Sequence, residues 1–219
     1  MASPNVPRQV AAEIVTVAAL SDALDAEGLR EQVMDQRIRP IAAGAPIVGP
    51  AFTIRAVRSE VFAERPYEKE LAATDAIPDG AVVVFDTDGT MDVGIWGELL
   101  STRAIARGAV GAVIDGGVRD LAGIDRLGFP TYASAIHPAD SYGRADVVAF
   151  DEPIVCGGVT VRPGDLIAAD IDGVVVVPAD KAEACMAAAL DKLARESDAQ
   201  EMLRGGASAT DTYGRHKVL

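Results

Sequence analysis

A helix start that pairs a glycine with an acidic residue is the first place in this sequence where chemistry could occur. Gly97-Glu98-Leu99-Leu100 opens a segment with helical character, and the free N–H groups and positive dipole end of a first turn suit a carboxylate or phosphate. The backbone amides of Leu99 and Leu100 are therefore candidate carboxylate binders, and Gly97 permits a close backbone approach. Taken alone, Glu98 could equally be an acid that only stabilises the helix dipole.

A glycine-containing segment that ends in two charged residues is the second such place. In Asp115-Gly116-Gly117-Val118-Arg119-Asp120 we expect a buried strand to end at Asp115 and the two glycines to turn the chain sharply. Arg119 offers a fixed fork of donors to an oxyanion or carbonyl oxygen, and Asp120 offers a hard oxygen to Mg²⁺ or Mn²⁺. The alternatives are a surface ion pair between the two neighbours, or an Asp that caps the next helix.

A strand–helix–strand unit would position both motifs. Residues 81–85 form a continuous apolar run of strand length, 97–107 have helical character and end at Gly108, and 109–114 form a second apolar run. Ligands of open α/β sheets bind beyond the carboxyl ends of such strands, which is where the second motif lies.

The rest of the chain predicts one mixed α/β domain over residues 1–219, without a repeat or a linker. A loop rich in proline and glycine is expected before residue 51, and the loop 86–94 and the tail 205–219 are expected to be irregular. The further helices are expected over 10–36, 65–75, 121–127 and 179–204, and the further strands over 51–57, 129–133, 147–150, 154–161, 165–168 and 174–177.

Composition and charge exclude several classes of protein. The chain has 219 residues, of which 49% are hydrophobic, so it can bury a sizeable core without disulfide or metal staples. The net charge of −13 argues against nucleic acid as a direct partner, because binding phosphates needs a basic surface. A signal peptide and an apolar run of membrane-spanning length are both absent from the sequence, so we expect a cytoplasmic protein that does not bind a membrane. Cys156 and Cys185 show no metal-ligand spacing and are expected to be reduced and structural.

The spacing between the two motifs matches one family of enzymes. Glu98 is followed by twenty residues and then by Arg119-Asp120. With this pattern the sequence resembles the class II pyruvate aldolases that cleave 4-hydroxy-4-methyl-2-oxoglutarate and 4-carboxy-4-hydroxy-2-oxoadipate, a family similar in sequence to the RraA proteins that regulate ribonuclease E. The resemblance covers residues 14–214 and includes Ser21-Asp22-Ala23-Leu24, Asp172-Gly173-Val174-Val175-Val176-Val177-Pro178 and Asp211-Thr212-Tyr213-Gly214.

The resemblance implies a metal site. Asp120 would hold a divalent metal ion, Mg²⁺ or Mn²⁺, and Glu98 would reach the ion through water. Many of these aldolases carry Asp at the first acidic position, so Glu98 leaves efficiency and substrate choice open. An acidic residue from a neighbouring subunit's C-terminal helix also contributes in the family; Glu196 is the nearest candidate, and Asp198 and Glu201 compete with it.

The resemblance also implies a binding mode, a fold and an assembly. Arg119 would bind the pyruvyl carbonyl oxygen and stabilise the enolate, while Gly97 and the amides of Leu99 and Leu100 would surround the pyruvyl carboxylate. The implied fold resembles the swivelling β/β/α (phosphohistidine-like) domain. The implied assembly is a homotrimer or a pair of trimers, with residues 179–219 at the subunit interface.

The residue types favour a metal over a Schiff base as the means of stabilising a pyruvate enolate. The chain has only four lysines, and none lies in an apolar strand where burial could depress its pKa: Lys69, Lys181, Lys192 and Lys217. We therefore expect a metal-dependent lyase that acts on 2-oxo acids to give pyruvate, with oxaloacetate decarboxylation as a companion activity. The rival interpretations are a non-catalytic, protein-binding regulator of the RraA type, and an enzyme of the same fold with another oxo or hydroxy acid as its substrate.

Overall fold

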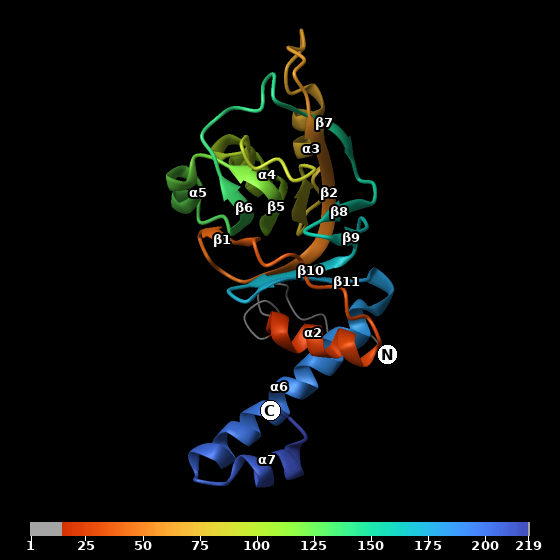
Figure 1. Cartoon of the computed structure of the whole chain (residues 1–219), viewed down its shortest axis with the longest axis vertical. Coiled ribbons are helices and arrows are strands. Elements are labelled where there is room, and N and C mark those ends of the chain that lie inside the picture. Colours follow the sequence, from red (N-terminus) through yellow and green to blue (C-terminus); the bar gives the residue numbers. More distant parts are fainter. Residues whose placement is uncertain (1–14, 219) are drawn as a thin grey trace.

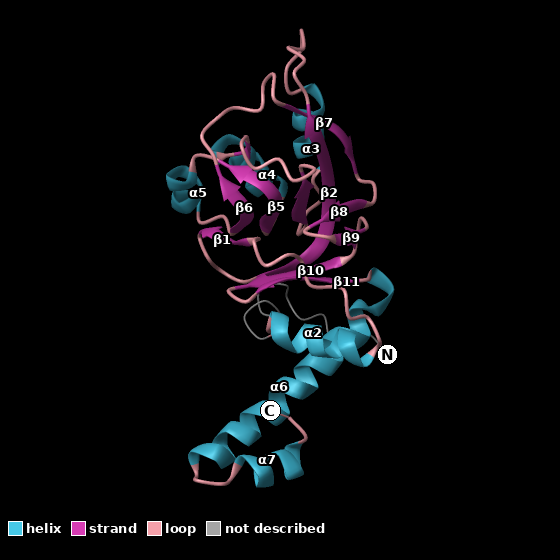
Figure 2. Ribbon diagram, in the orientation of Figure 1, coloured by secondary structure: helices cyan, strands magenta, loops and turns pink. Residues whose placement is uncertain are grey.

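A curled, mixed sheet with helices on its faces is the centre of the computed structural model, which describes residues 15–218 (Figures 1 and 2). Its nine strands follow the order β1-β6-β5-β3-β2-β10-β11, with β4 paired to β5 and β7 paired to β2. These strands are β1 Arg39–Ala42, β2 Ile47–Arg58, β3 Val82–Asp86, β4 Gly94–Trp96, β5 Gly111–Val118, β6 Thr131–Ile136, β7 Ala145–Phe150, β10 Leu166–Asp170 and β11 Gly173–Val177. The predicted class, one α/β domain, is confirmed.

Parallel strands β2, β3, β5 and β6 form the middle of the sheet, and their continuous apolar runs are buried on both faces. One face packs against α3 Glu68–Ala76, α4 Glu98–Arg107 and α5 Leu121–Leu127. The other face packs against a hairpin of β8 Ile154–Cys156 and β9 Val159–Val161. Alternate residues of β3 therefore enter different cores: Val83 faces the helices and Val84 faces the hairpin.

The remaining helices cover strands β10 and β11 at one end of the molecule. Helix α2 Val17–Ala26 and the first part of α6 Ala182–Arg204 enclose a separate apolar core there, and a short 3₁₀ turn, Ala179–Lys181, leads into α6. The rest of α6 extends away from the sheet, and α7 Ala209–His216 folds back on it (Figure 1). No helix among the described residues is long and apolar enough to span a membrane.

Several predicted boundaries were wrong at the ends of the chain. The first helix covers Val17–Ala26 and not residues 10–36, because the Thr16 side chain caps its start and Gly28, with a φ of 79°, follows its end; residues 10–14 lie outside the described part. The expected irregular tail contains α7. Ser208 caps this helix by accepting a hydrogen bond from the amide of Asp211 at 3.0 Å and donating one to its carboxylate at 2.8 Å.

Two further corrections concern glycines that were interpreted as turn residues. Strand β2 begins at Ile47, so Gly49 lies inside it. A Cβ atom at Gly49 would come within 2.6 Å of the carbonyl oxygen of Gly80, shortly before β3. Strand β5 continues through Gly116 and Gly117 instead of turning at Asp115. A Cβ atom on Gly117 would lie 2.2 Å from the carbonyl oxygen of Val93, so this glycine allows the loop 86–94 and β4 to pack on β5.

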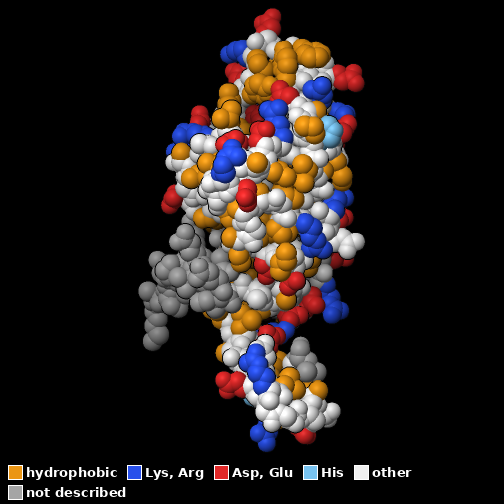
Figure 3. Space-filling view, turned by 90° about the vertical axis from the view of Figure 1, so that its left-hand side faces the viewer, with side chains coloured by type: hydrophobic (Ala, Val, Ile, Leu, Met, Phe, Trp, Pro, Cys, Tyr) orange, Lys and Arg blue, Asp and Glu red, His pale blue; other side chains and the backbone are white. Residues whose placement is uncertain are grey.

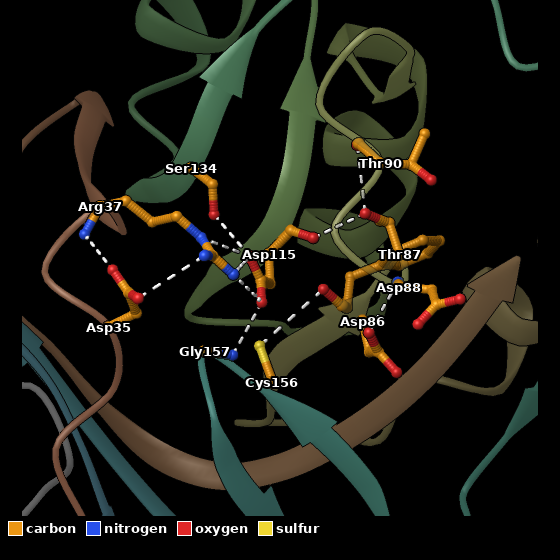
Figure 4. Close-up of polar contacts among 11 residues, drawn as sticks. Asp35, Arg37, Asp86, Thr87, Asp88, Thr90, Asp115, Ser134, Cys156 and Gly157 are labelled. Atoms are coloured by element: carbon orange, nitrogen blue, oxygen red, sulfur yellow. Dashed lines mark hydrogen bonds and ion pairs between the residues drawn. The ribbon is translucent and has the colours of Figure 1, made fainter. Parts of the chain in front are cut away.

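Asp115 is a structural residue at the centre of a polar network (Figure 4). Its carboxylate accepts two hydrogen bonds of 3.0 Å from Arg37, one of 2.7 Å from Ser134 and one of 2.9 Å from the amide of Gly157. The network joins β5 to the segment before β1 and to the β8–β9 hairpin. Cys156, beside it, is buried and free, and burial raises the pKa of its thiol, as expected of a reduced structural cysteine.

Candidate active site

Gly97 brings the two predicted motifs together. It precedes α4 in an extended conformation, and its carbonyl oxygen accepts the first helical hydrogen bond, of 3.0 Å, from the amide of Ser101. A Cβ atom at Gly97 would lie 2.8 Å from a carboxylate oxygen of Asp120 and 3.3 Å from Cγ of Arg119. The N-cap residue of α4 is therefore in direct contact with the Arg119-Asp120 pair.

Strand β4 positions the start of the second motif. Trp96 is paired with Val118 across the β4–β5 ladder, and its carbonyl oxygen accepts a hydrogen bond of 2.9 Å from the amide of Arg119. Trp96 itself is fully buried and donates to the hydroxyl of Ser101 at 2.8 Å. Because a buried ring and a backbone pair fix the chain on both sides, Arg119 leaves the sheet in one defined direction.

Asp120 has a backbone conformation that is uncommon for a residue other than glycine. Its φ is 59° and its ψ is 33°, in the left-handed region, and it stands at the N-cap position of α5. Its side chain makes no capping hydrogen bond and is 51% exposed. The capping alternative is therefore wrong. The ion-pair alternative is met only by a long contact, 3.9 Å, between Arg119 Nε and Asp120 Oδ2.

A pocket of about 210 Å³ opens at this junction. Five predicted residues line it, namely Gly97, Leu99, Leu100, Arg119 and Asp120. Sequence reasoning missed the other residues of its wall, which are Tyr67, Glu70, Leu71, Gly94, Ile95, Asp140 and Ser141.

Topology could have indicated Asp140. This residue lies in the segment that follows β6, and β6 is parallel to β5 and adjacent to it. Loops after neighbouring parallel strands meet at the same edge of a sheet, so the loop after β6 had to approach Arg119. Tyr67 and Glu70 carried no comparable signal, because the start of α3 reaches the pocket through the packing of the helical layer.

Glu98 is a predicted site residue that does not line this pocket. Its carboxyl group lies over Gly123 of α5, where a Cβ atom would come within 2.2 Å of it, and it forms an ion pair with Arg126 at 3.6 Å. The side chain is 41% exposed. Its predicted contact with a metal through water stays a prediction.

Glu196 belongs to α6, and this helix lies at the opposite end of the molecule from α4 (Figure 1). Within its own chain it pairs with Lys192 at 3.3 Å. The contribution expected from this helix concerns a neighbouring subunit and stays a prediction.

The donor set of the pocket fits a hydrated magnesium or manganese ion better than a fully protein-bound metal. Among the described residues, no group of three or more His, Cys, Asp or Glu side chains is placed to hold a metal ion. Asp120 nevertheless offers an exposed carboxylate that is not used as a cap. Mg²⁺ commonly binds through one or two carboxylates and keeps several waters, so a single chain supplies the minimum that such an ion needs.

Glu70 is the titratable group of the pocket with the most altered environment. Burial is the main cause that raises the pKa of this half-buried carboxyl to about 7; the Asp140 and Asp146 carboxylates act in the same direction and Arg119 opposes them. Near neutral pH Glu70 therefore exchanges a proton, which changes the net charge of the pocket.

We expect the stability of the protein to report this titration. Because the pKa of Glu70 is higher in the folded chain than the ordinary value of 4.5, the folded state binds the extra proton between about pH 4.5 and 7, and stability falls as pH rises through that interval. Thermal unfolding of Glu70→Gln and wild type should thus coincide near pH 4, and the variant should become increasingly more stable up to about pH 7.5. Glu68→Gln, an exposed residue of the same helix, is the control. A Glu70→Gln difference that is the same at every pH would contradict the assignment.

Comparison with known proteins identifies the family. Residues 17–176 match the RraA-like family, described as Aldolase/RraA. A protein of Halalkalibacterium halodurans named "Putative 4-hydroxy-4-methyl-2-oxoglutarate aldolase" is 31% identical over 199 residues, which cover 91% of this chain and 90% of the relative. The chain belongs to the aldolase/RraA family.

Proteins similar to this chain differ in length and in described role. Protein DlpA of Legionella pneumophila is 34% identical over 164 residues, but the match spans only 26% of its length. A solved structure of Streptomyces coelicolor RraAS2, described as an unusual member of the RNase ES inhibitor RraA family, superposes with a TM-score of 0.78 at 27% identity and covers 91% of this chain and 98% of that one. An uncharacterized protein of Pseudomonas syringae superposes with a TM-score of 0.80 at 27% identity, covering 96% and 99%. The similar proteins thus include one named as a putative aldolase and one described as a member of a ribonuclease inhibitor family.

Proposed function

We propose that this protein is a divalent-metal-dependent carbon–carbon lyase that cleaves 4-hydroxy-2-oxo acids of the 4-hydroxy-4-methyl-2-oxoglutarate type and releases pyruvate. The observation that carries the proposal is the meeting of Arg119, Asp120 and the first turn of α4 in one small pocket. The aldolase names of several relatives, 31–37% identical, support a lyase.

In the proposed binding mode, the first turn of α4 and Arg119 bind different parts of the pyruvyl group. The amides of Leu99 and Leu100 point from the positive end of the helix and suit the carboxylate. The guanidinium of Arg119 suits the oxygen of the 2-oxo group, where negative charge develops as an enolate forms. Asp120 would hold the metal ion, with Glu98 as the expected partner through water, and the ion would supply Lewis-acid polarisation of the 2-oxo acid when bound.

The proposed reaction conserves atoms and charge through a pyruvate enolate. In cleavage, the C4 hydroxyl loses a proton, the C3–C4 bond breaks, C4 becomes a carbonyl and the electron pair of the bond forms the enolate. The enolate then takes a proton at C3 to give pyruvate. Oxaloacetate reaches the same enolate by losing carbon dioxide, so we propose its decarboxylation as a second activity of the same residues.

Exposed apolar side chains around the pocket support the proposed assembly of several copies. Leu99, which lines the pocket, is 83% exposed. Phe62, in the projecting loop between β2 and α3, is 70% exposed. Figure 3 shows hydrophobic side chains gathered at that projecting end. A homotrimer or a pair of trimers would cover such surfaces and could bring Glu196 of one copy towards the pocket of another.

A direct assay tests the proposed activity. The protein, stripped of metal with a chelator, is expected to release no pyruvate from oxaloacetate or from a 4-hydroxy-2-oxo acid, and Mg²⁺ or Mn²⁺ should restore the release from both. Pyruvate is measured with a coupled dehydrogenase, and the spontaneous decay of oxaloacetate with metal alone is subtracted. If metal restores release from neither substrate, the proposal is wrong.

An RraA-type regulator is the second candidate, favoured by the structural likeness to RraAS2 and by the net charge of −13, which suits basic, arginine-rich protein segments. An Asp120→Ala variant distinguishes the two functions, because only the lyase needs a metal ligand at this position. Co-purification with a ribonuclease that persists in Asp120→Ala, together with an inactive wild type in the pyruvate assay, would favour the regulator.

A further inference from the structure

Asp140 lies between the arginine of the pocket and a tyrosine from another element. One oxygen of its carboxylate, Oδ1, forms an ion pair with Nη2 of Arg119 at 3.1 Å and accepts a hydrogen bond of 2.9 Å from the amide of Ser141. The other oxygen, Oδ2, accepts a hydrogen bond of 2.5 Å from the hydroxyl of Tyr67. Both oxygens of Asp140 are therefore engaged by protein groups.

This arrangement places two carboxylates against the guanidinium of Arg119. Asp140 contacts Nη2 at 3.1 Å, and Asp120 lies 3.9 Å from Nε. The Arg119 side chain is 37% exposed, so packing alone does not fix it, and an arginine has many rotamers to lose. A fixed carboxylate is the means by which the fork of an arginine can be held in one orientation.

The loop that carries Asp140 is itself fastened to the sheet. The amide of Gly94, in β4, donates to the carbonyl oxygen of Ala139 at 2.7 Å, and Arg144 donates to the carbonyl oxygen of Asp140 at 3.0 Å. A Cβ atom at Gly94 would lie 2.3 Å from the carbonyl oxygen of His137, so the loop packs directly on the β4 backbone. Asp140 thus has a rigid base.

Tyr67 completes the arrangement from the start of α3. Its φ of 63° is uncommon for an aromatic residue, and its ring lies 6.1 Å from that of Tyr142. The hydrogen bond to Asp140 is the main cause that raises the pKa of Tyr67 to about 12, so the hydroxyl remains a donor at all physiological pH values.

We propose that Asp140 is the positioning residue of Arg119 and that Tyr67 fixes Asp140 in turn. The inference rests on the proposed function in one respect, namely that Arg119 contacts the developing enolate. The contacts that position Arg119 are present without a substrate. Asp140 acts through Arg119 and does not touch the substrate, which leaves Asp120 as the carboxylate available for a metal ion.

Variants of both residues test the inference against a matched control. Asp140→Asn should lower kcat by about 10–100-fold with a change in KM of less than about threefold, because a misplaced arginine loses contact mainly in the transition state. Tyr67→Phe should lower kcat by a smaller factor, about three- to tenfold, since it removes one hydrogen bond. Asp75→Asn removes the pair of Asp75 with Arg103, of 2.7 Å, between α3 and α4 outside the pocket, and should leave both constants unchanged. Circular dichroism and thermal unfolding check that each variant folds.

A double-mutant cycle separates positioning from a purely structural role. In an Arg119→Ala background, Asp140→Asn should have no further effect on kcat, and Asp140→Glu in the otherwise wild-type chain should restore part of the activity. An Asp140→Asn effect of the same factor in both backgrounds, or wild-type kcat in Asp140→Asn, would overturn the inference.

Binding of oxalate, a planar dianion that resembles the pyruvate enolate, gives a readout that does not need turnover. In the presence of Mg²⁺, calorimetry should show affinity about tenfold weaker in Asp140→Asn than in wild type or Asp75→Asn. Weaker binding in Asp140→Asn alone, with a wild type that releases no pyruvate, would refute the proposed reaction and keep the positioning. Equal oxalate binding in all three proteins would refute the positioning while leaving the reaction standing.

Discussion

Replacing Arg119 by alanine is expected to lower kcat/KM for pyruvate release by about 10²–10³-fold, the usual loss for one positioned donor to a developing oxyanion. The guanidinium lies beside Asp120 and Asp140, and among the described residues that line the pocket no other arginine or lysine could replace it. Steady-state kinetics with oxaloacetate and with a 4-hydroxy-2-oxo acid would measure the effect, and both substrates should lose activity by a similar factor because they share an enolate.

Arg119→Lys is the sharper variant of this experiment. A lysine keeps the charge but offers one ammonium in place of a planar fork, so it cannot contact Asp140 and the substrate oxygen in the same geometry. We expect a loss closer to that of alanine than to wild type. Arg103→Ala is the matched control, since Arg103 is 48% exposed and pairs with Asp75 outside the pocket. If Arg103→Ala lost as much activity as Arg119→Ala, the role of the guanidinium at the pocket would be refuted.

The sequence was sufficient for the parts of the site that are continuous in the chain. The helix start at Gly97 and the Arg119-Asp120 pair follow from local patterns, and helix 121–127 and the C′ role of Gly108 were placed correctly for the same reason. Apolar runs likewise predicted the central strands, because strands buried on both faces need no alternation.

The features that the sequence did not predict depend on packing between distant segments. Gly116 and Gly117 are typical of a turn when considered alone, yet they continue β5 because the loop 86–94 needs their missing side chains to pack against the strand. The side chain of Glu98 points to Gly123 of α5 and not into the pocket, which only the packing of α4 on α5 decides. Tyr67 reaches the site across the helical layer, so no spacing in the sequence connects it to Asp140.

Asp120→Asn is the second variant with a large expected effect, and its backbone makes it a clean test of the metal prediction. Asparagine tolerates the left-handed conformation that Asp120 adopts, with its φ of 59°, and it is nearly isosteric with aspartate. The fold should therefore be preserved, whereas the charged oxygen that a hard cation prefers is lost. Thermal unfolding in the absence of metal should be within a few degrees of wild type.

The loss expected from Asp120→Asn differs in kind from that of Arg119→Ala. We expect kcat/KM to fall by about 10²–10³-fold, since Lewis-acid stabilisation contributes several kcal/mol to such reactions. Titration of Mn²⁺ followed by electron paramagnetic resonance should show weakened binding in Asp120→Asn and nearly unchanged binding in Arg119→Ala. Glu98→Gln should be intermediate if this residue reaches the ion through water. Wild-type Mn²⁺ affinity in Asp120→Asn would remove Asp120 from the metal site and, with it, the reason to prefer a metal-dependent reaction at this pocket.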